Sequence, residues 1–215
     1  MRDSVARHRE MLQEGLSRCA KDLEPETGRL LREQLAASEP TGYEAAALAC
    51  LSAAEAVGGT AAAALPGALS VAFLGQMGLV FAGLEDSGGA AGLSTAWAMP
   101  RALNAGDAMF ALAQESILSA PNELTAADRL AAVALLDRGG RDLVDALYAA
   151  GEEGDGVVAG QRALLPVAFA LGALLGGADV QGRERLAQLG RAWSSLPENE
   201  LSRNLAGDAA GWLAT

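Results

Sequence analysis

The chain has 215 residues, which is enough for one well-buried domain. Hydrophobic residues make up 51% of it and aromatic residues only 4%, while the formal net charge is −11. Lys21 is the only lysine. Binding to nucleic acid or to an anionic membrane requires a basic surface, so this composition argues against both kinds of partner.

The composition favours helices over strands. Alanine and leucine supply most of the apolar mass, and no stretch shows the alternation typical of a strand. The two cysteines, Cys19 and Cys50, have no metal-ligand or disulfide-framework spacing, which indicates a reducing compartment. The N-terminus is charged throughout and lacks the apolar core of a signal peptide, so a cytoplasmic location is expected.

Apolar spacing predicts an all-α bundle of about eight helices in a single domain. Residues 1–37 form one or two amphipathic helices, residues 38–196 form the core, and the tail 197–215 is weakly patterned. Turn residues and Gly-rich breaks separate the core helices. These are expected at 43–57, 60–86, 100–119, 125–136, 141–150, 158–175 and 181–196, with kinks at Pro66 and Pro166.

One segment raises the question of a membrane span. From Val57 to Leu84 the chain carries no charge, and this length can cross a bilayer. The segment is rich in Ala and Gly, is broken by Gly58, Gly59 and Pro66, and has acidic rather than basic residues beside it. A buried pair of core helices is therefore the prediction, with a membrane span as the alternative.

Five segments, read in order, form a recognisable set. They read LSAAEAVGG (51–59), LVFAGLED (79–86), LNAGDAMFAL (103–112), GGRDL (139–143), and GQRALL (160–165) followed by LGALLGGAD (171–179). In these segments the chain resembles the isoprenyl diphosphate synthase (polyprenyl synthetase) family. That family has LAAEALGG, LIHDDxxD, AINAGDxLFAL, GQxxDL and GKTAxL...LGALLAGAD in the same order. The resemblance covers roughly residues 40 to 200 and implies an isoprenoid-synthase-like bundle.

The resemblance also implies a chemistry. Two Asp-rich motifs on facing helices of the family hold Mg²⁺, which binds and ionises an allylic diphosphate. Arg and Lys side chains grip isopentenyl diphosphate through charge-assisted hydrogen bonds. Family members form dimers, and the resemblance places the dimer contact largely on the helix from Asn104 to Ser119.

The residues that carry this chemistry are replaced here. The first Asp pair reads Ala82-Gly83, and the second Asp motif reads PENEL at 197–201. The Lys-Thr of GKT reads Gln161-Arg162, and the basic stretch expected before Ala45 reads ASEPTG. The chain also ends where the family continues for several helices, so the bundle is expected to be shortened at the C-terminus. No cofactor is predicted, and Mg²⁺ is not expected to bind in the family manner.

Two acidic residues remain near the first motif. Glu85 and Asp86 are weak candidates for a residual metal site, against the alternative of a solvated helix end. Neighbouring residues of a helix point about 100° apart, so Glu85 and Asp86 do not share one helix face as the metal-binding Asp residues of the family motif do.

Ligand-binding candidates come from the resemblance as well. Gly75, Gly78 and Phe81 lie on the helix that lines the prenyl-chain tunnel of the family. The glycines either leave an apolar cavity or allow tight helix packing. Asp107 and Arg162 are further candidates; a structural hydrogen bond for Asp107 and a surface role for Arg162 are the alternatives. His8 is the only histidine and is expected to be solvated, which leaves no Ser-His-Asp arrangement.

The sequence thus predicts a non-catalytic homologue that does not transfer prenyl groups alone. Its expected state is a homodimer or a heterodimer with a catalytically complete prenyl synthase. An isoprenoid-binding protein that uses the residual tunnel, an enzyme with other chemistry in that cavity, and a structural homodimer are the alternatives.

Overall fold

The computed structural model describes residues 2–23, 28–29, 31–32, 42–85, 99–120, 124–149, 156–197, 200 and 203–204. This part of the chain contains eight α-helices and no strand, which confirms the all-α prediction. The helices are α1 (Arg2–Asp22), α3 (Gly42–Ala56), α4 (Ala61–Glu85), α5 (Met99–Leu118), α6 (Ala126–Ala149), α7 (Gly156–Ala163), α8 (Leu165–Leu175) and α9 (Val180–Ser194).

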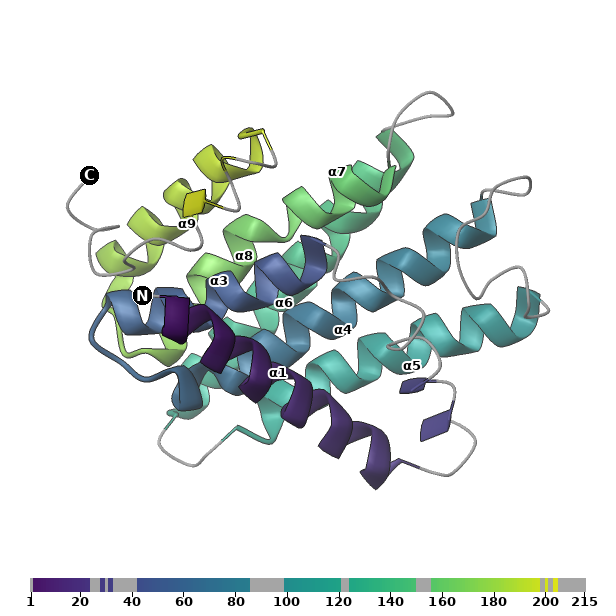
Figure 1. Cartoon of the computed structure of the whole chain (residues 1–215), viewed down its shortest axis with the longest axis horizontal. Coiled ribbons are helices and arrows are strands. Elements are labelled where there is room, and N and C mark those ends of the chain that lie inside the picture. The colour runs from purple at the N-terminus through teal and green to yellow at the C-terminus, as the bar shows by residue number, and fades with distance from the viewer. Residues whose placement is uncertain are drawn as a thin grey trace.

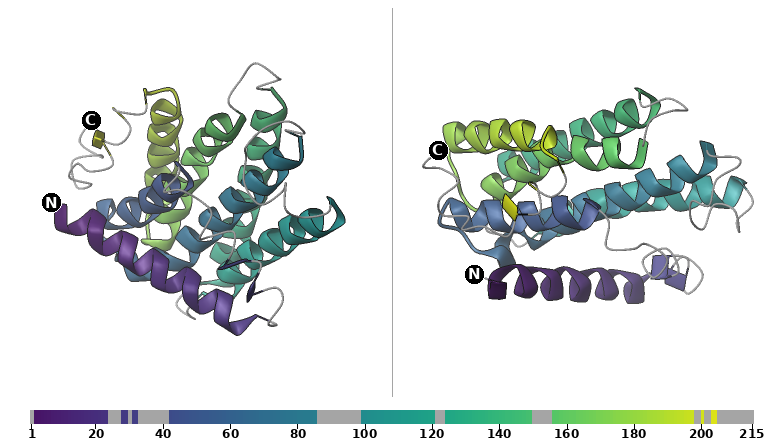
Figure 2. Two further views of the ribbon diagram at one scale, coloured as in Figure 1. Left: turned by 45° about the vertical axis from the view of Figure 1, so that its right-hand side comes forward. Right: turned by 45° about the horizontal axis from the view of Figure 1, so that its top comes forward.

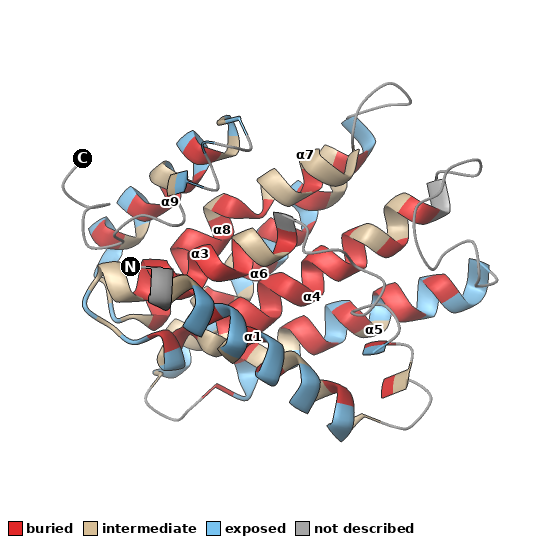
Figure 3. Ribbon diagram, in the orientation of Figure 1, coloured by how far each residue is buried: buried red, intermediate tan, exposed pale blue. Residues whose placement is uncertain are grey.

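Helix α4 is the centre of the bundle. It packs against α1, α3, α5, α6, α7 and α8, and in Figure 1 it runs beside α3 and α5 through the middle of the molecule. Residues from Val71 to Gly78 are all buried, as the red ribbon of α4 in Figure 3 shows. A helix that is apolar on every side needs cover on every side, and the surrounding helices provide it.

The uncharged segment is therefore a core helix here. By length and composition alone, two stretches could cross a membrane, Ala61–Gly83 and Gly156–Leu175. In the most apolar 18 residues of the first stretch, 78% is buried inside the protein, and in those of the second stretch 61% is buried. Core helices of soluble proteins have these properties, so the two stretches are weak evidence for a span.

Two helix boundaries differ from the sequence-based expectation. The gap expected between 136 and 141 is absent, because α6 continues through Gly139 and Gly140. An added Cβ at Gly139 would lie 2.6 Å from Val167 Cγ1, so this glycine serves close packing rather than a break. The kink expected at Pro166 is instead a break between α7 and α8 at Leu164. Pro166 lies in the first turn of α8, where backbone N–H groups have no partner within the helix, so its missing N–H costs no hydrogen bond.

Tyr43 of α3 fills the space beside two glycines of α4. An added Cβ at Gly75 would lie 2.3 Å from the Tyr43 ring. At Gly78 it would lie 3.1 Å from the Tyr43 hydroxyl oxygen and 3.0 Å from Leu143 Cδ1. Tyr43 is 1% exposed and Leu143 is fully buried, so side chains of α3 and α6 occupy this side of α4.

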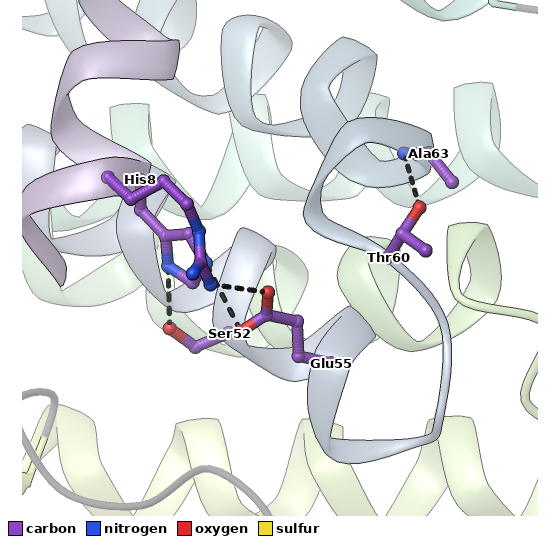
Figure 4. Close-up of polar contacts among 6 residues, drawn as sticks. His8, Ser52, Glu55, Thr60 and Ala63 are labelled. Carbon is purple, nitrogen blue, oxygen red and sulfur yellow. Dashed lines mark hydrogen bonds and ion pairs between the residues drawn. The ribbon is translucent and has the colours of Figure 1, made fainter. Parts of the chain in front are cut away.

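Helix α1 lies across α3 and α4 as an outer layer, which the right-hand view of Figure 2 shows clearly. A buried polar cluster joins it to α3. His8 Nε2 lies 3.2 Å from Glu55 Oε2, and His8 Nδ1 lies 3.4 Å from Ser52 Oγ (Figure 4). Arg7 Nη2 reaches the other Glu55 oxygen at 3.1 Å. His8 is 1% exposed, so the expectation that it is solvated is wrong; α3 offers polar partners at that point of α1.

The glycine contact makes a first prediction. Gly75→Ala should lower the free energy of unfolding by about 1–3 kcal/mol, because the new methyl group would overlap the Tyr43 ring. Gly140→Ala is the matched control: its Cβ would meet Phe110 and Leu74 at 3.6 and 3.7 Å, which is ordinary contact. This control should be neutral or stabilising by up to about 1 kcal/mol. Urea unfolding measures both, and equal effects would contradict the packing described.

The His8 cluster makes a second prediction. His8→Ala should cost about 1–3 kcal/mol, because it removes a buried side chain and leaves the Ser52 hydroxyl without its partner. Arg7→Ala should cost at most about 1 kcal/mol, since the Arg7 side chain is 56% exposed and its ion pair is solvated. Urea unfolding of the two variants separates these cases. A smaller loss for His8→Ala than for Arg7→Ala would refute the structural role of the cluster.

Candidate functional site

A groove with a volume of about 990 Å³ lies between α4, α5 and α6. Its apolar surface comes from Met77, Phe81, Phe110 and Val144. Its polar surface comes from Gln114, Asp137, Arg138, Arg141 and Asp145. We call this hollow the α5–α6 groove.

Close helix packing sets the position of Phe81 in this groove. An added Cβ at Gly106 of α5 would lie 2.3 Å from Phe81 Cε1, so only a glycine admits the ring at that point. Phe81 is half-buried, while Phe110 remains 37% exposed. The groove thus has two aromatic rings at its apolar surface and charged side chains from α6 beside them.

Helix α5 also presents an apolar stripe to solvent. Met99, Leu103, Phe110 and Leu118 are exposed by 62, 45, 37 and 59%. At about 100° per residue these four positions fall within one arc of roughly 100° on the helix. We call these four residues the α5 stripe. A second hollow of about 230 Å³ involves another part of α5 and is lined by Leu31, Arg101, Asn104, Ala105, Ala108, Met109 and Leu112.

The ligand-binding candidates from the sequence do not form one cluster. Gly75 and Gly78 pack against Tyr43 and Leu143 in the interior, as described above. Phe81 lines the α5–α6 groove on another side of α4. Asp107 is exposed on α5, and Arg162 is half-buried on α7. A ligand role for any of these residues stays a prediction.

Of the two weak metal candidates, only Glu85 belongs to α4. The helix ends at Glu85, and Asp86 lies outside the described residues. Ala82 and Gly83, which stand in place of the Asp pair of the resembled motif, have no side-chain oxygen for a metal. Among the described residues, no three His, Cys, Asp or Glu side chains gather as a metal site.

The cluster of Ser52, His8 and Glu55 has the residue types of a hydrolytic triad, which the sequence pattern did not indicate. Its members come from α1 and α3, so no local motif signals it. Ser52 is 6% exposed and His8 is 1% exposed, which leaves no approach for a substrate to the hydroxyl. The cluster therefore joins two helices rather than forming an active site.

The cysteines also lack the features of nucleophiles. Both thiols are free. Burial raises the pKa of the Cys50 thiol. Burial, with a smaller contribution from the Asp22 carboxylate, raises the pKa of Cys19. A raised pKa leaves less of the reactive thiolate at neutral pH, so neither cysteine has the environment of a catalytic one.

The charged side of the groove was not predicted from the sequence. Arg138, Arg141 and Asp145 were not singled out, although Arg138 and Arg141 lie within or beside the GGRDL segment. Their spacing along one helix was the available signal, because residues three and four apart share a face. The expected break at 137–140 hid that signal by dividing α6 into two helices.

Comparisons with known proteins give structural relatives only: no protein-family model and no curated protein matches the chain. A geranylgeranyl pyrophosphate synthetase from the archaeon Geoglobus acetivorans is 21% identical, with a TM-score of 0.74 over 89% of this chain and 66% of that one. A polyprenyl synthetase from Streptomyces coelicolor A3(2) is 25% identical, with a TM-score of 0.69 over 89% of this chain and 62% of that one.

A third similar structure is a deletion mutant of the heterotetrameric geranyl pyrophosphate synthase of mint. It is 18% identical, with a TM-score of 0.71, and both chains are covered completely. The chain spans less than two thirds of the length of the archaeal and Streptomyces synthases. All three likenesses concern the backbone arrangement. They agree with the resemblance that the sequence motifs indicate, and the protein therefore has the fold of the isoprenyl diphosphate synthases.

Proposed function

We propose that this protein is a catalytically degenerate isoprenyl diphosphate synthase homologue that serves as a subunit of an active prenyl synthase. The observation that carries the proposal is the α5 stripe, whose apolar side chains are exposed to solvent and whose Phe110 lines the α5–α6 groove. The stripe would be the contact surface for a catalytically complete chain of the same fold. The cell compartment would be the cytoplasm, in keeping with two free cysteines.

The exposed stripe supports an interface. Exposed apolar side chains beside a hollow are typical of protein–protein contact sites, since the centres of such sites are apolar and well packed. Leu103 and Leu118 remain about half exposed, although most of the other leucines whose burial the structure describes are buried. One of the structural relatives is a heterotetrameric synthase, which gives a precedent for subunit association in this fold.

The substitutions at the metal motifs support the loss of independent activity. Where the resembled family has its first Asp pair, the last turns of α4 carry Ala82 and Gly83. Mg²⁺ requires oxygen ligands, and neither side chain provides one. Pairing with a complete synthase would allow the chain to influence product length or stability without binding metal.

A third prediction tests the interface. Affinity purification of the tagged protein from its native host should recover a full-length prenyl synthase that carries both Asp-rich motifs. Leu103→Asp with Leu118→Asp should reduce recovery at least about tenfold, because unpaired charges would be buried at the contact. Val180→Asp is the matched control, since Val180 is 77% exposed but lies on α9. Consistent failure of the unmodified protein to bind such a synthase would sink the proposal.

The α5–α6 groove favours a second candidate, an isoprenoid-binding protein. Its apolar surface suits a hydrocarbon chain, and Arg138 and Arg141 suit an anionic head group. The sequence-based hypothesis placed the isoprenoid in the residual tunnel beside Gly75 and Gly78. These glycines face packed side chains, whereas the α5–α6 groove is open, so the candidate site moves to the groove.

A fourth prediction belongs to this candidate. Mass spectrometry of lipid extracted from the native protein should find an isoprenoid, and Phe110→Glu should lower its occupancy at least about tenfold by placing a charge in the groove. Val180→Glu should leave occupancy unchanged. Absence of any carried lipid from both the unmodified protein and the control would remove this candidate and leave the subunit role in place.

A further inference from the structure

The smaller hollow lies on the opposite side of α5 from the α5 stripe. Its lining residues on α5 run from Arg101 to Leu112. At about 100° per residue they fall within an arc whose centre is roughly 160° from the centre of the stripe. The helix rises about 16 Å over this length. The volume of about 230 Å³ is below the roughly 300–1,000 Å³ of sites for drug-sized ligands, so the hollow suits a small molecule. We call it the Arg101 hollow.

Most of the lining of the Arg101 hollow is apolar. Leu31, Ala105, Met109 and Leu112 are buried, and Ala108 is half-buried. Ala105 and Ala108 each end at Cβ, so no long side chain from these two positions fills the space. A hydrocarbon group that enters the hollow is therefore removed from water without displacing a side chain of the protein, which favours its binding.

The polar groups of the hollow lie toward the N-terminal end of α5, which begins at Met99. They are the exposed side chains of Arg101 and Asn104. Arg101 already takes part in an interaction within the chain, and its five N–H donors allow a guanidinium to bind more than one acceptor. The N-terminal end of a helix also carries a partial positive charge. This end of the hollow thus favours an anionic group, while the end at Leu112 is apolar.

The charge of the hollow favours a ligand with a single negative charge. Arg101 is the one charged residue among those that line it. A guanidinium binds a carboxylate through two parallel hydrogen bonds, and the two charges then balance. A diphosphate carries several negative charges, and one arginine would leave most of them uncompensated on a chain with a net charge of −11. A carboxylate is therefore the head group that fits best.

We propose that the Arg101 hollow binds a small amphipathic carboxylate. Its carboxylate group accepts hydrogen bonds from Arg101 and Asn104, and its hydrocarbon chain lies along α5 toward Leu112. This inference goes beyond the proposed function and does not rest on it, because the hollow and the α5 stripe are on opposite sides of the helix.

Isothermal titration calorimetry of the intact protein with octanoate tests the site. We expect a Kd of roughly 1 mM or tighter, which a ligand of about ten non-hydrogen atoms can reach. 1-Octanol keeps the hydrocarbon chain but lacks the charge, and it should bind at least about tenfold more weakly. Arg101→Gln should weaken octanoate binding by a similar factor. Arg141→Gln is the matched control and should not change it, because Arg141 lines the α5–α6 groove instead. Inorganic pyrophosphate should not compete with octanoate.

Filling the hollow gives an independent test. Ala108→Leu should abolish octanoate binding, while the free energy of unfolding in urea stays the same or rises, because the larger side chain occupies open space. Ala111→Leu is the matched control at an exposed alanine of the same helix, and it should retain octanoate binding.

Several outcomes would overturn this inference. They are no octanoate binding by the unmodified protein, undiminished binding by Arg101→Gln or by Ala108→Leu, and competition by pyrophosphate. Loss of binding in Arg141→Gln would place the ligand in the α5–α6 groove, and a large loss of stability in Ala108→Leu would show that the space is already filled. None of these results affects recovery of a synthase by the tagged protein, which tests the proposed function separately.

Discussion

The fold depends on the burial of one uncharged helix. From Ala61 to Leu84, helix α4 has no ionisable side chain, and exposure of so much apolar surface would cost far more than a domain's net stability. Six helices therefore pack around it. The neighbouring helices can approach α4 closely because α4 has glycines where their side chains pack against it, as at Gly75 beside Tyr43.

This constraint limits where function can reside. Side chains of α3 and α6 fill the space beside Gly75 and Gly78, so this part of the interior is packed. Polar groups in the interior, such as His8 and Ser52, join helices and are closed to substrate. The surface of α5 and α6 differs, because apolar and charged side chains there remain without cover. The proposed association uses that surface.

Much of the fold could be predicted from sequence, and the reasons are local. Alanine-rich periodic segments with Gly or Pro at their ends predicted helix positions close to those observed, for example at Gly58 and Gly59 after α3. The failures arose where tertiary packing outweighs local preference. Gly139 continues a helix, and Val167 packs closely onto it. Pro166 lies in the first turn of a helix that was expected to bend there.

The candidate surface was harder to predict than the fold. The helix from Asn104 to Ser119 was singled out through the family resemblance, and the structure adds which of its faces is exposed. The groove could not be foreseen, because it depends on how α4, α5 and α6 meet and not on any one segment. The burial of His8 was missed for the same reason, since its partners lie on α3.

The most direct test of the central claim is a prenyl-transfer assay. The purified chain would be given an allylic diphosphate, isopentenyl diphosphate and Mg²⁺, first alone and then with the synthase recovered from its host. We expect no product from the chain alone and a changed product length or yield when it is added to the synthase. Turnover by the isolated chain, abolished by chelation of Mg²⁺, would contradict the claim that it is a non-catalytic subunit.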